Sequence, residues 1–364
     1  MGWGPPLGQV TGIEVTVHRT LDGVTPTEWN AVVAEQSSTG SVFERYGWLR
    51  AHEAATGTGG RYVEVREDGT LVGVLAAVRR PVPGTGLRFL GPPRPGYAGP
   101  SIATDERAVL DALLDAVLVD RSWRTIGHLV KPSRSAALRY ARNLRSRGYV
   151  PTVRSVEFLV DVDRPWDAVE GDFRRDTRRN LQTADERDVT TRRVEPTPAD
   201  VDRFFERHRE AMDRLDGEGA SRALLQALRR HVPERILLFR ASVDGEDVGQ
   251  QFAVCDRERG QVHLLFPGWS EEGFAYESPT ALYRAALRWA VDAEWATACN
   301  LGETDPDHES GNFRYKEGFG GDLVPTVRWE RVHSRPLRVA YLLSADSVPG
   351  AVIGAARRFL SEIR

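Results

Sequence analysis

The sequence predicts a mixed α/β protein (α+β) made of two similar domains in tandem, each with a mostly antiparallel central sheet flanked by helices. The chain has 364 residues, a length that suits two domains better than one. The order of elements also repeats, because strand, helices, antiparallel strands, helix, strand, helix and strand follow one another in both halves. We expect domains over 12–155 and 156–335, followed by a helical tail over 336–364.

The first half supplies the elements of the first expected domain. Residues 61–80 carry a hairpin signal, because two β-rich runs flank Asp68 and Gly69, a pair that favours a tight turn. Residues 81–100 are dense in glycine and proline and are expected to form a long irregular loop. Hydrophobic periodicity predicts strands over 12–19, 125–130 and 150–162 and helices over 42–55, 105–120 and 133–148.

The second half repeats this order. A helix over 278–295 is expected to begin with Ser278 as its N-cap and Pro279 at its first helical position. The patterns predict further helices over 173–189, 197–215, 221–232 and 310–321 and strands over 190–196, 235–243, 246–256, 260–270, 297–303 and 323–332.

Composition narrows the class of function. The net charge is −3, so the molecule as a whole does not attract polyanions, and we expect no stable DNA binding. Cys255 and Cys299 lie far apart, and the histidines are scattered, so we expect no disulfide, no bound metal and a reducing, cytoplasmic location. No run of about 18 apolar residues occurs, which argues against a membrane-spanning helix.

The helix over 173–189 carries a cluster of arginines. Arg174 and Arg178 stand four residues apart, as do Arg175 and Arg179, so two adjacent stripes present four guanidinium groups. Such a surface suits phosphate, because guanidinium donates in a bidentate fork and stays charged. The alternative is an ordinary solvated face balanced by neighbouring aspartates, and composition alone favours that alternative.

The start of the helix at 278 is a second candidate for anion binding. Unpaired backbone N–H groups and the positive end of the helix dipole suit a carboxylate or a phosphate there. The glycine-rich fingerprint of acyl-CoA transferases is missing, since residues 271–279 contain only Gly273. The site and an ordinary capped helix remain equally open interpretations.

The third candidate lies in residues 303–321. Lysine occurs only at 131 and 316 among 49 basic residues, so Lys316 is kept against a strong bias toward arginine. Glu303 ends a predicted strand, where α/β folds place catalytic groups. A compact ammonium suits the stabilisation of negative charge that develops on an acyl oxygen. Chance placement is the alternative, because Lys131 has no evident role.

These segments together resemble the Fem-type (FemAB-like) branch of the GNAT acyltransferase superfamily. The strongest motif is Gly-Asn-Phe-Arg-Tyr-Lys-Glu-Gly-Phe-Gly over 311–320, and looser similarity extends over about 12–335. The resemblance implies two tandem GNAT-like domains and transfer of an acyl or aminoacyl group to an amine. It also implies that Lys316 contacts the acyl donor or its transition state. The long coiled-coil arm of some members is absent.

We therefore expect an N-acyltransferase with Lys316 and Glu303 as its catalytic residues. No tightly bound cofactor is expected, and the co-substrate is acyl-CoA or aminoacyl-tRNA. A conventional acetyl-CoA N-acetyltransferase of a small amine or sugar stays open, as does a non-catalytic nucleic-acid-binding module. The candidate residues for binding substrate or donor are Arg178, Arg179, Asn180, Tyr276, Ser278, Thr280, Asn312 and Tyr315.

Overall fold

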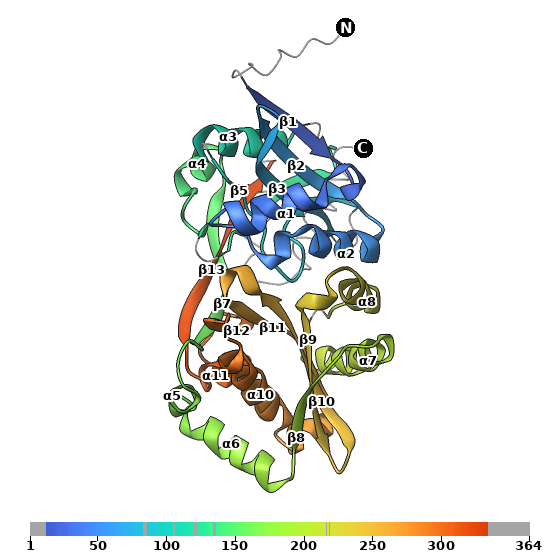
Figure 1. The fold of residues 1–364 in the computed structure, drawn as a ribbon, viewed down its shortest axis with the longest axis vertical. Helices are drawn as coiled ribbons and strands as arrows, with labels where there is room; N and C mark the ends of the chain where they lie inside the picture. Colours follow the sequence, from blue (N-terminus) through green and yellow to red (C-terminus); the bar gives the residue numbers. More distant parts are fainter. Residues whose placement is uncertain are drawn as a thin grey trace, which may run out of the picture. The chain divides into compact units, whose positions relative to one another are not determined.

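The computed structural model describes residues 12–82, 86–104, 106–119, 122–133, 136–215, 217 and 219–333. The chain forms two compact units (Figure 1). Among the described residues, unit 1 comprises those within 12–49, 58–152 and 327–333, and unit 2 comprises those within 50–57 and 153–326. The expected domain limits at 155 and 335 stay a prediction, and the helical tail lies outside the described residues.

Unit 1 is built on a mostly antiparallel sheet with the order β1-β2-β3-β4-β6-β13, and β5 pairs with β3. Strands β4 and β6 are parallel. The strands are β1 (Ile13–His18), β2 (Gly60–Glu67), β3 (Thr70–Pro81), β4 (Arg88–Gly91), β5 (Ser101–Ile102), β6 (Thr125–Val130) and the end of β13 (Asp322–Val332). The helices are α1 (Pro26–Ala31), the start of α2 (Tyr46–Thr56), α3 (Glu106–Ala116) and α4 (Ala141–Ser146).

Unit 2 repeats this plan with the strand order β7-β12-β11-β10-β9-β8, in which β11 and β12 are parallel. The strands are β7 (Val150–Asp161), β8 (Thr190–Val194), β9 (Ile236–Val243), β10 (Glu246–Asp256), β11 (Gln261–Trp269) and β12 (Ala298–Thr304). The helices are α5 (Trp166–Gly171), α6 (Arg175–Glu186), α7 (Pro198–Leu215), α8 (Arg222–His231), α9 (Glu271–Ala275), α10 (Ser278–Asp292) and α11 (Gly311–Glu317). Helices α7 and α8 lie on one side of this sheet, and α10 and α11 lie on the other (Figure 1).

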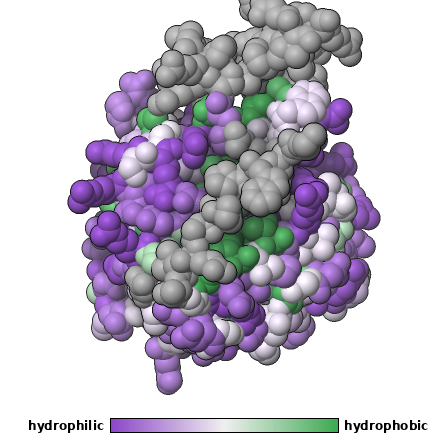
Figure 2. Space-filling model, turned by 90° about the horizontal axis from the view of Figure 1, so that it is seen from above, coloured by the Kyte–Doolittle hydropathy of each residue, from purple (hydrophilic) through white to green (hydrophobic). Residues whose placement is uncertain are grey.

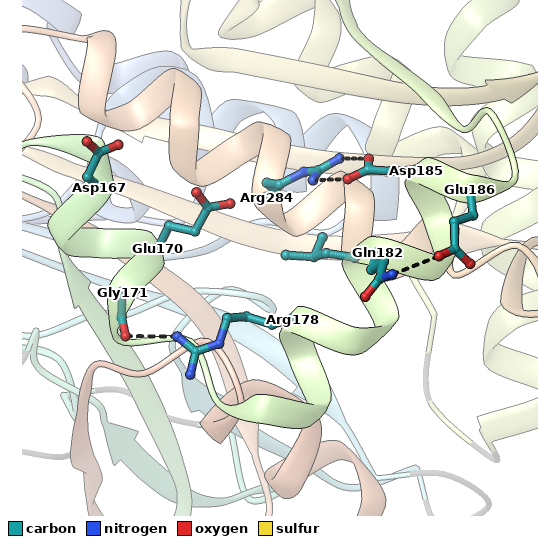
Figure 3. Close-up of a pocket in the computed structure, with 9 residues that line it drawn as sticks. Asp167, Glu170, Gly171, Arg178, Gln182, Asp185, Glu186 and Arg284 are labelled. Atoms are coloured by element: carbon teal, nitrogen blue, oxygen red, sulfur yellow. Dashed lines mark hydrogen bonds and ion pairs between the residues drawn. The ribbon is translucent and has the colours of Figure 1, made fainter.

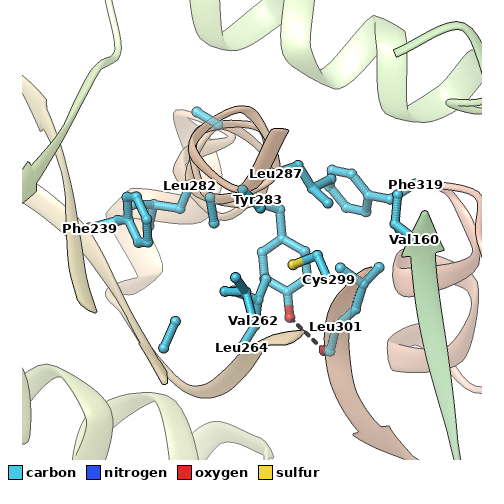
Figure 4. Packing of buried hydrophobic residues seen from close by; sticks show 14 of the residues in the cluster. Val160, Phe239, Val262, Leu264, Leu282, Tyr283, Leu287, Cys299, Leu301 and Phe319 are labelled. Atoms are coloured by element: carbon cyan, nitrogen blue, oxygen red, sulfur yellow. Dashed lines mark hydrogen bonds between the residues drawn. The ribbon is translucent and has the colours of Figure 1, made fainter. Parts of the chain in front are cut away.

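The core of unit 2 forms between its sheet and α10. Side chains from the strands and from the apolar face of α10 interdigitate there, as Figure 4 shows. Tyr283 of α10 is buried among them, and its hydroxyl donates to the carbonyl oxygen of Leu301 at 3.4 Å. Burial raises the pKa of Tyr283 far above its usual range, because the phenolate would lose its hydration. The core therefore fixes α10 directly against β12.

The predicted mixed α/β class and most predicted elements are confirmed. The hairpin between β2 and β3 turns at Asp68 and Gly69, both with positive φ (49° and 79°). The expected loop over 81–100 is wrong in one part, because residues 88–91 form β4 and pair with β6. This strand also pairs antiparallel with β3, from Pro81 opposite Arg88 to Val78 opposite Gly91, so it lies between β3 and β6 in the sheet. The glycines and prolines around its four residues hid it from the sequence pattern.

Two expected helix starts are also corrected. Among the described residues, the helix predicted over 133–148 is α helix only over Ala141–Ser146. The carbonyl oxygen of Ala137 accepts a hydrogen bond from the indole of Trp329 at 2.9 Å instead of serving an α-helical turn. In α10, Glu277 precedes the helix with a φ of 58°, and Ser278 lies inside its first turn. The Ser278 hydroxyl donates to the carbonyl oxygen of Val248 at 3.3 Å, so it does not act as the N-cap.

Within the part of the chain that the structure describes, no helix is long and apolar enough to cross a membrane. On the face shown in Figure 2, polar and charged side chains occupy most of the periphery and hydrophobic ones gather near the middle. Both cysteines are buried and unbonded to each other.

Candidate active site

The parallel strands β11 and β12 separate in the middle of the unit 2 sheet. They pair only as far as His263 and Asn300, although β11 continues to Trp269 and β12 to Thr304. The pairing of β11 with β10 shifts at the same level, where Leu265 is the extra residue of a β-bulge. Such an irregularity leaves backbone polar groups outside the regular ladder. Beyond His263 and Asn300 the two strands therefore leave the regular parallel ladder.

Lys316 of α11 contacts β12 just beyond the last residue that pairs with β11. Its ammonium donates to the carbonyl oxygen of Gly302 at 3.0 Å and to that of Glu303 at 2.7 Å. The side chain is only 5% exposed. Burial lowers the pKa of Lys316 to about 8, against the opposing effect of the negative charges of Glu303 and Glu157. Near neutral pH most of the molecules therefore still carry the ammonium.

The carboxylate of Glu303 lies on β12 beside the neighbouring strand β7. It accepts a hydrogen bond from the hydroxyl of Ser155 at 2.7 Å. Glu157 is buried and stands directly opposite Glu303 in the antiparallel pair β7–β12. Successive residues of a strand alternate between its faces, so Ser155 and Glu157 share the face that meets Glu303. One ammonium and two carboxylates are thus held by two strands and one helix.

Glycine at 302 makes this arrangement possible. Its φ is 83°, a conformation that L side chains rarely adopt. A Cβ atom there would lie 2.7 Å from the carbonyl oxygen of Leu264 and 3.4 Å from the ammonium nitrogen of Lys316. The amide of Gly302 also donates to the side-chain oxygen of Asn300 at 2.8 Å. The absence of a side chain therefore lets β12 bend past β11 and turn two carbonyl oxygens toward Lys316.

The arrangement is suited to chemistry at an acyl carbon. An ammonium has three N–H donors, and the described residues use two of those of Lys316. The third is free to bind an oxygen that becomes negative. A carboxylate within the same cluster is suited to accept a proton.

Tyr315 packs beside Lys316 but faces the core. Its ring lies 5.2 Å from that of Tyr283 and 5.4 Å from that of Phe319, both edge to face. Burial raises the pKa of the Tyr315 phenol well above its usual range, and the nearby hydroxyl of Thr280 opposes that shift. Tyr315 therefore holds α11 to the core, and its neighbour Asn312 is exposed on the same helix.

The start of α10 is covered. Ser278 and Thr280 are buried, and Tyr276 is half-buried against the core. The Thr280 hydroxyl donates to the carboxylate of Glu277 at 3.2 Å, so an acidic side chain of the chain itself occupies the positive end of this helix. A phosphate bound there would meet this negative charge.

The α6 arginines face solvent. Arg178 donates to the carbonyl oxygen of Gly171 at 3.2 Å, and Arg179 lies 3.4 Å from the carboxylate of Asp176. Asn180 is half-buried on the same helix. Arg178 borders a pocket of about 740 Å³ between α5, α6 and α10 (Figure 3). Its other labelled lining residues are Asp167, Glu170, Gly171, Gln182, Asp185, Glu186 and Arg284.

The structure brings some of the predicted site residues together and leaves others apart. Lys316 contacts Glu303 where β12 leaves its pairing with β11, and Tyr315 meets Thr280 at the core. Arg178 and Arg179 lie elsewhere, on the exposed side of α6. Sequence reasoning missed Ser155, Glu157 and Gly302. The alternation of residues 150–162 places the first two on one strand face, and this signal identifies them once the register is known.

The described residues gather no set of metal ligands in one place. Over the described residues, no group of three or more histidine, cysteine, aspartate or glutamate side chains is placed to bind an ion. The cluster at Lys316 instead offers hydrogen-bond donors and acceptors.

Comparison with known proteins agrees with this architecture. Residues 171–317 match the family model described as an acetyltransferase (GNAT) domain. None of the curated proteins matches the sequence. Among solved structures, FemX superposes with a TM-score of 0.68 at 16% identity, covering 91% of this chain and 100% of that one.

Two further structures share the fold. One is L-PGS from Bacillus licheniformis, with a TM-score of 0.56 and 16% identity, covering 88% of this chain and 96% of the other. The second is a tandem GNAT protein from the clavulanic acid biosynthesis pathway, with a TM-score of 0.53 and 12% identity over 88% of this chain and 99% of the other. At these identities the likeness is one of fold.

Residues 171–317 of unit 2 therefore carry a GNAT domain, and this match supports an acyltransferase. The fold of the chain is shared with FemX and with the tandem GNAT protein. The acyltransferase class and the Fem-type likeness predicted from the sequence are confirmed, the likeness at the level of fold.

Proposed function

We propose that acyl transfer takes place where β11 and β12 separate, with Lys316 and Glu303 as the catalytic residues. The neutral amine of the acceptor attacks the carbonyl carbon of the donor, and a C–N bond forms. The ammonium of Lys316 binds the carbonyl oxygen as it becomes negative. Glu303 takes the proton that the amine loses, directly or through water. The C–S or C–O bond of the donor then breaks, and the departing thiolate or alkoxide takes up that proton and leaves as the thiol or the alcohol.

The observation that carries this proposal is the buried position of Lys316 on two carbonyl oxygens of β12. Those bonds fix the ammonium nitrogen without neutralising it through a direct ion pair. A fixed, desolvated donor stabilises developing charge more than one that must reorganise from water. Although burial lowers the pKa of Lys316, its value of about 8 is still above neutral pH, so the group stays mostly charged there.

The donor is an acyl thioester or an aminoacyl ester. The solved tandem GNAT protein is described as the form without acetyl-CoA, and this reference to acetyl-CoA keeps a CoA thioester as one candidate. The carboxylate of Glu277 at the start of α10 disfavours a pyrophosphate at that helix end and so favours an aminoacyl ester, such as aminoacyl-tRNA. Arg178 and Arg179 on the exposed side of α6 are then available to the donor or acceptor phosphates.

The remaining expectations belong to the same proposal. Asn180, Tyr276, Asn312 and Tyr315 stay candidates for contact with substrate or for support of the site. Two buried, unbonded cysteines agree with a reducing cytoplasmic location. We also keep the predicted domain limits, 12–155 for the first domain and 156–335 for the second.

A donor assay with a surrogate amine tests the proposal. Purified protein is mixed with hydroxylamine and either acetyl-CoA or bulk aminoacyl-tRNA, and hydroxamate is measured above an enzyme-free blank. We expect formation from one donor and its loss in Lys316→Met. The matched control is Lys131→Met, which also removes a buried ammonium, one that lies 4.7 Å from the centre of the Tyr97 ring in unit 1. Full activity of Lys316→Met removes the catalytic role of Lys316.

A further inference from the structure

Unit 1 contains a polar hollow between helices α3 and α4. Its volume is about 540 Å³, within the range of small-molecule sites in proteins. Four of its lining residues are arginines and two are acidic, so positive charges outnumber negative ones by two. The lining residues are Glu106, Arg107, Leu110, Asp111, Arg139, Tyr140, Arg142, Asn143, Ser146 and Arg147.

Two of the four arginines are already paired. Arg139 lies 2.7 Å from the carboxylate of Glu106, and this contact raises the pKa of the guanidinium. Arg147 lies 3.0 Å from the carboxylate of Asp111 and 3.0 Å from that of Asp115. Both acidic residues of the lining are therefore engaged by these two arginines.

The other two arginines have no counter-charge at the pocket. Arg107 on α3 and Arg142 on α4 are exposed, and among the described residues neither makes a side-chain hydrogen bond or an ion pair. They come from the two helices that border the hollow. The hydroxyl of Tyr140 donates to Glu106, and the amide of Asn143 donates to Asp111, so these neutral groups are engaged with the acids.

The chemistry of the lining selects the ligand. Two unpaired guanidinium groups favour a ligand with two negative charges and several oxygens, which a phosphate or a diphosphate provides. A carboxylate carries one charge and fills one guanidinium fork. Leu110 is the aliphatic member of the lining, so the hollow offers little surface to a hydrocarbon chain. We propose that the α3–α4 hollow of unit 1 binds the phosphate or diphosphate group of a small molecule, through Arg107 and Arg142.

Calorimetric titration of the full-length protein with sodium pyrophosphate tests this site, in low-salt buffer without divalent cations. The wild type is expected to bind pyrophosphate. Each guanidinium removed is expected to weaken binding about tenfold or more, so the double variant R107Q/R142Q is expected to bind about 100-fold more weakly or worse. The matched control is R187Q/R230Q, which removes two exposed arginines of unit 2 that lie outside the hollow. This control is expected to bind like the wild type.

Two further titrants separate the sources of the phosphate. The affinity for ADP is expected to fall in R107Q/R142Q as the affinity for pyrophosphate does. The affinity for a single-stranded RNA oligonucleotide is expected to be the same in this variant as in the wild type. Circular dichroism spectra and thermal melts of both double variants establish that they are folded. The proposal is overturned if the wild type shows no saturable binding, if R107Q/R142Q binds pyrophosphate like the wild type, or if the control loses as much affinity.

Discussion

The ammonium of Lys316 lies against carbonyl oxygens, and its environment decides how it titrates. Removal from water favours the neutral amine, whereas the charges of Glu303 and Glu157 favour the ammonium. Burial has the larger effect, so the pKa falls to about 8. A modest rise in pH above neutrality therefore changes the charge of the proposed catalytic group.

The pH dependence of turnover distinguishes the charged form from the neutral one. If the ammonium binds the acyl oxygen, turnover of the wild type falls as pH rises through about 8, where Lys316 loses its proton. Lys316→Arg keeps a charge that does not titrate there, so its residual turnover lacks this fall. Lys316→Met is expected to lose about 100-fold or more. Steady-state rates of the wild type and of both variants are measured from about pH 6 to about pH 10, that is, about two pH units on either side of the pKa of Lys316.

A rise of wild-type turnover through the same pH, absent from Lys316→Arg, would identify the neutral amine as a base instead. The comparison with the arginine variant is necessary because the acceptor amine also titrates. Its contribution is common to both proteins and cancels in their ratio.

The same pKa affects stability. The folded pKa of Lys316 lies below its unfolded value of 10.5, so the unfolded chain binds more protons between about pH 8 and pH 10.5. The free energy of unfolding therefore rises with pH in this window. Between about pH 8 and pH 10.5, the free energy of unfolding of the wild type rises by up to about 3 kcal/mol more than that of Lys316→Met. Urea unfolding at several pH values measures the difference, and parallel pH curves for the two proteins would contradict it.

The scarcity of lysine and the Fem-type motif over 311–320 together predicted Lys316 as a site residue. Ser155 and Glu157 carry no comparable signal. Their meeting with Glu303 depends on the register of β7 against β12, which pairs residues almost 150 positions apart. Side-chain pairing across a sheet follows from that register and not from local pattern.

At the scale of the element, β12 depends on one glycine. Gly302→Ala would place a Cβ atom 2.7 Å from the carbonyl oxygen of Leu264 in a backbone with positive φ. We expect a loss of about 1–3 kcal/mol in stability and reduced turnover, because the carbonyl oxygens that hold Lys316 would move. Chemical denaturation and the hydroxamate assay measure the two effects.

Gly311→Ala is the matched control for this substitution. Gly311 begins α11, and a Cβ atom there meets no heavy atom within 4 Å. Alanine in a helix is more favourable than glycine by about 0.5–1 kcal/mol, so this variant is expected to be as stable as the wild type or slightly more so. If Gly302→Ala and Gly311→Ala lose stability and turnover equally, backbone strain at position 302 is not the cause of the losses.

Turn chemistry explains why the hairpins were predicted well and other elements less so. Asp-Gly pairs at 68–69 and 244–245 adopt the positive φ values that a tight hairpin turn requires. Those requirements are met by adjacent residues. The late start of α4 depends instead on Trp329, which lies 192 residues further along the chain than Ala137 and whose indole donates a hydrogen bond to the Ala137 carbonyl oxygen. Elements fixed by distant partners are the ones that local periodicity describes poorly.

At the scale of the whole molecule, each unit has its own hydrophobic core. Leu113 of α3 is fully buried in the core of unit 1, and Leu287 of α10 is fully buried in that of unit 2. Both units also contain a parallel strand pair inside a mostly antiparallel sheet. The repeated plan appeared in the sequence as an order of elements, since the halves share pattern and not residues. Separate cores are the physical basis for treating the units as separate domains.

Separate cores predict separate responses to core damage. Leu113→Ala and Leu287→Ala each remove a buried side chain and leave a cavity, at a cost of about 2–5 kcal/mol. We expect faster amide hydrogen exchange mainly in the unit that carries the substitution, because local opening follows the stability of the cooperative unit. Exchange followed by mass spectrometry compares peptides of β2 and β3 with those of β9 and β10. If either substitution accelerates exchange equally in both sets, the chain opens as one cooperative body and the division into two domains is wrong.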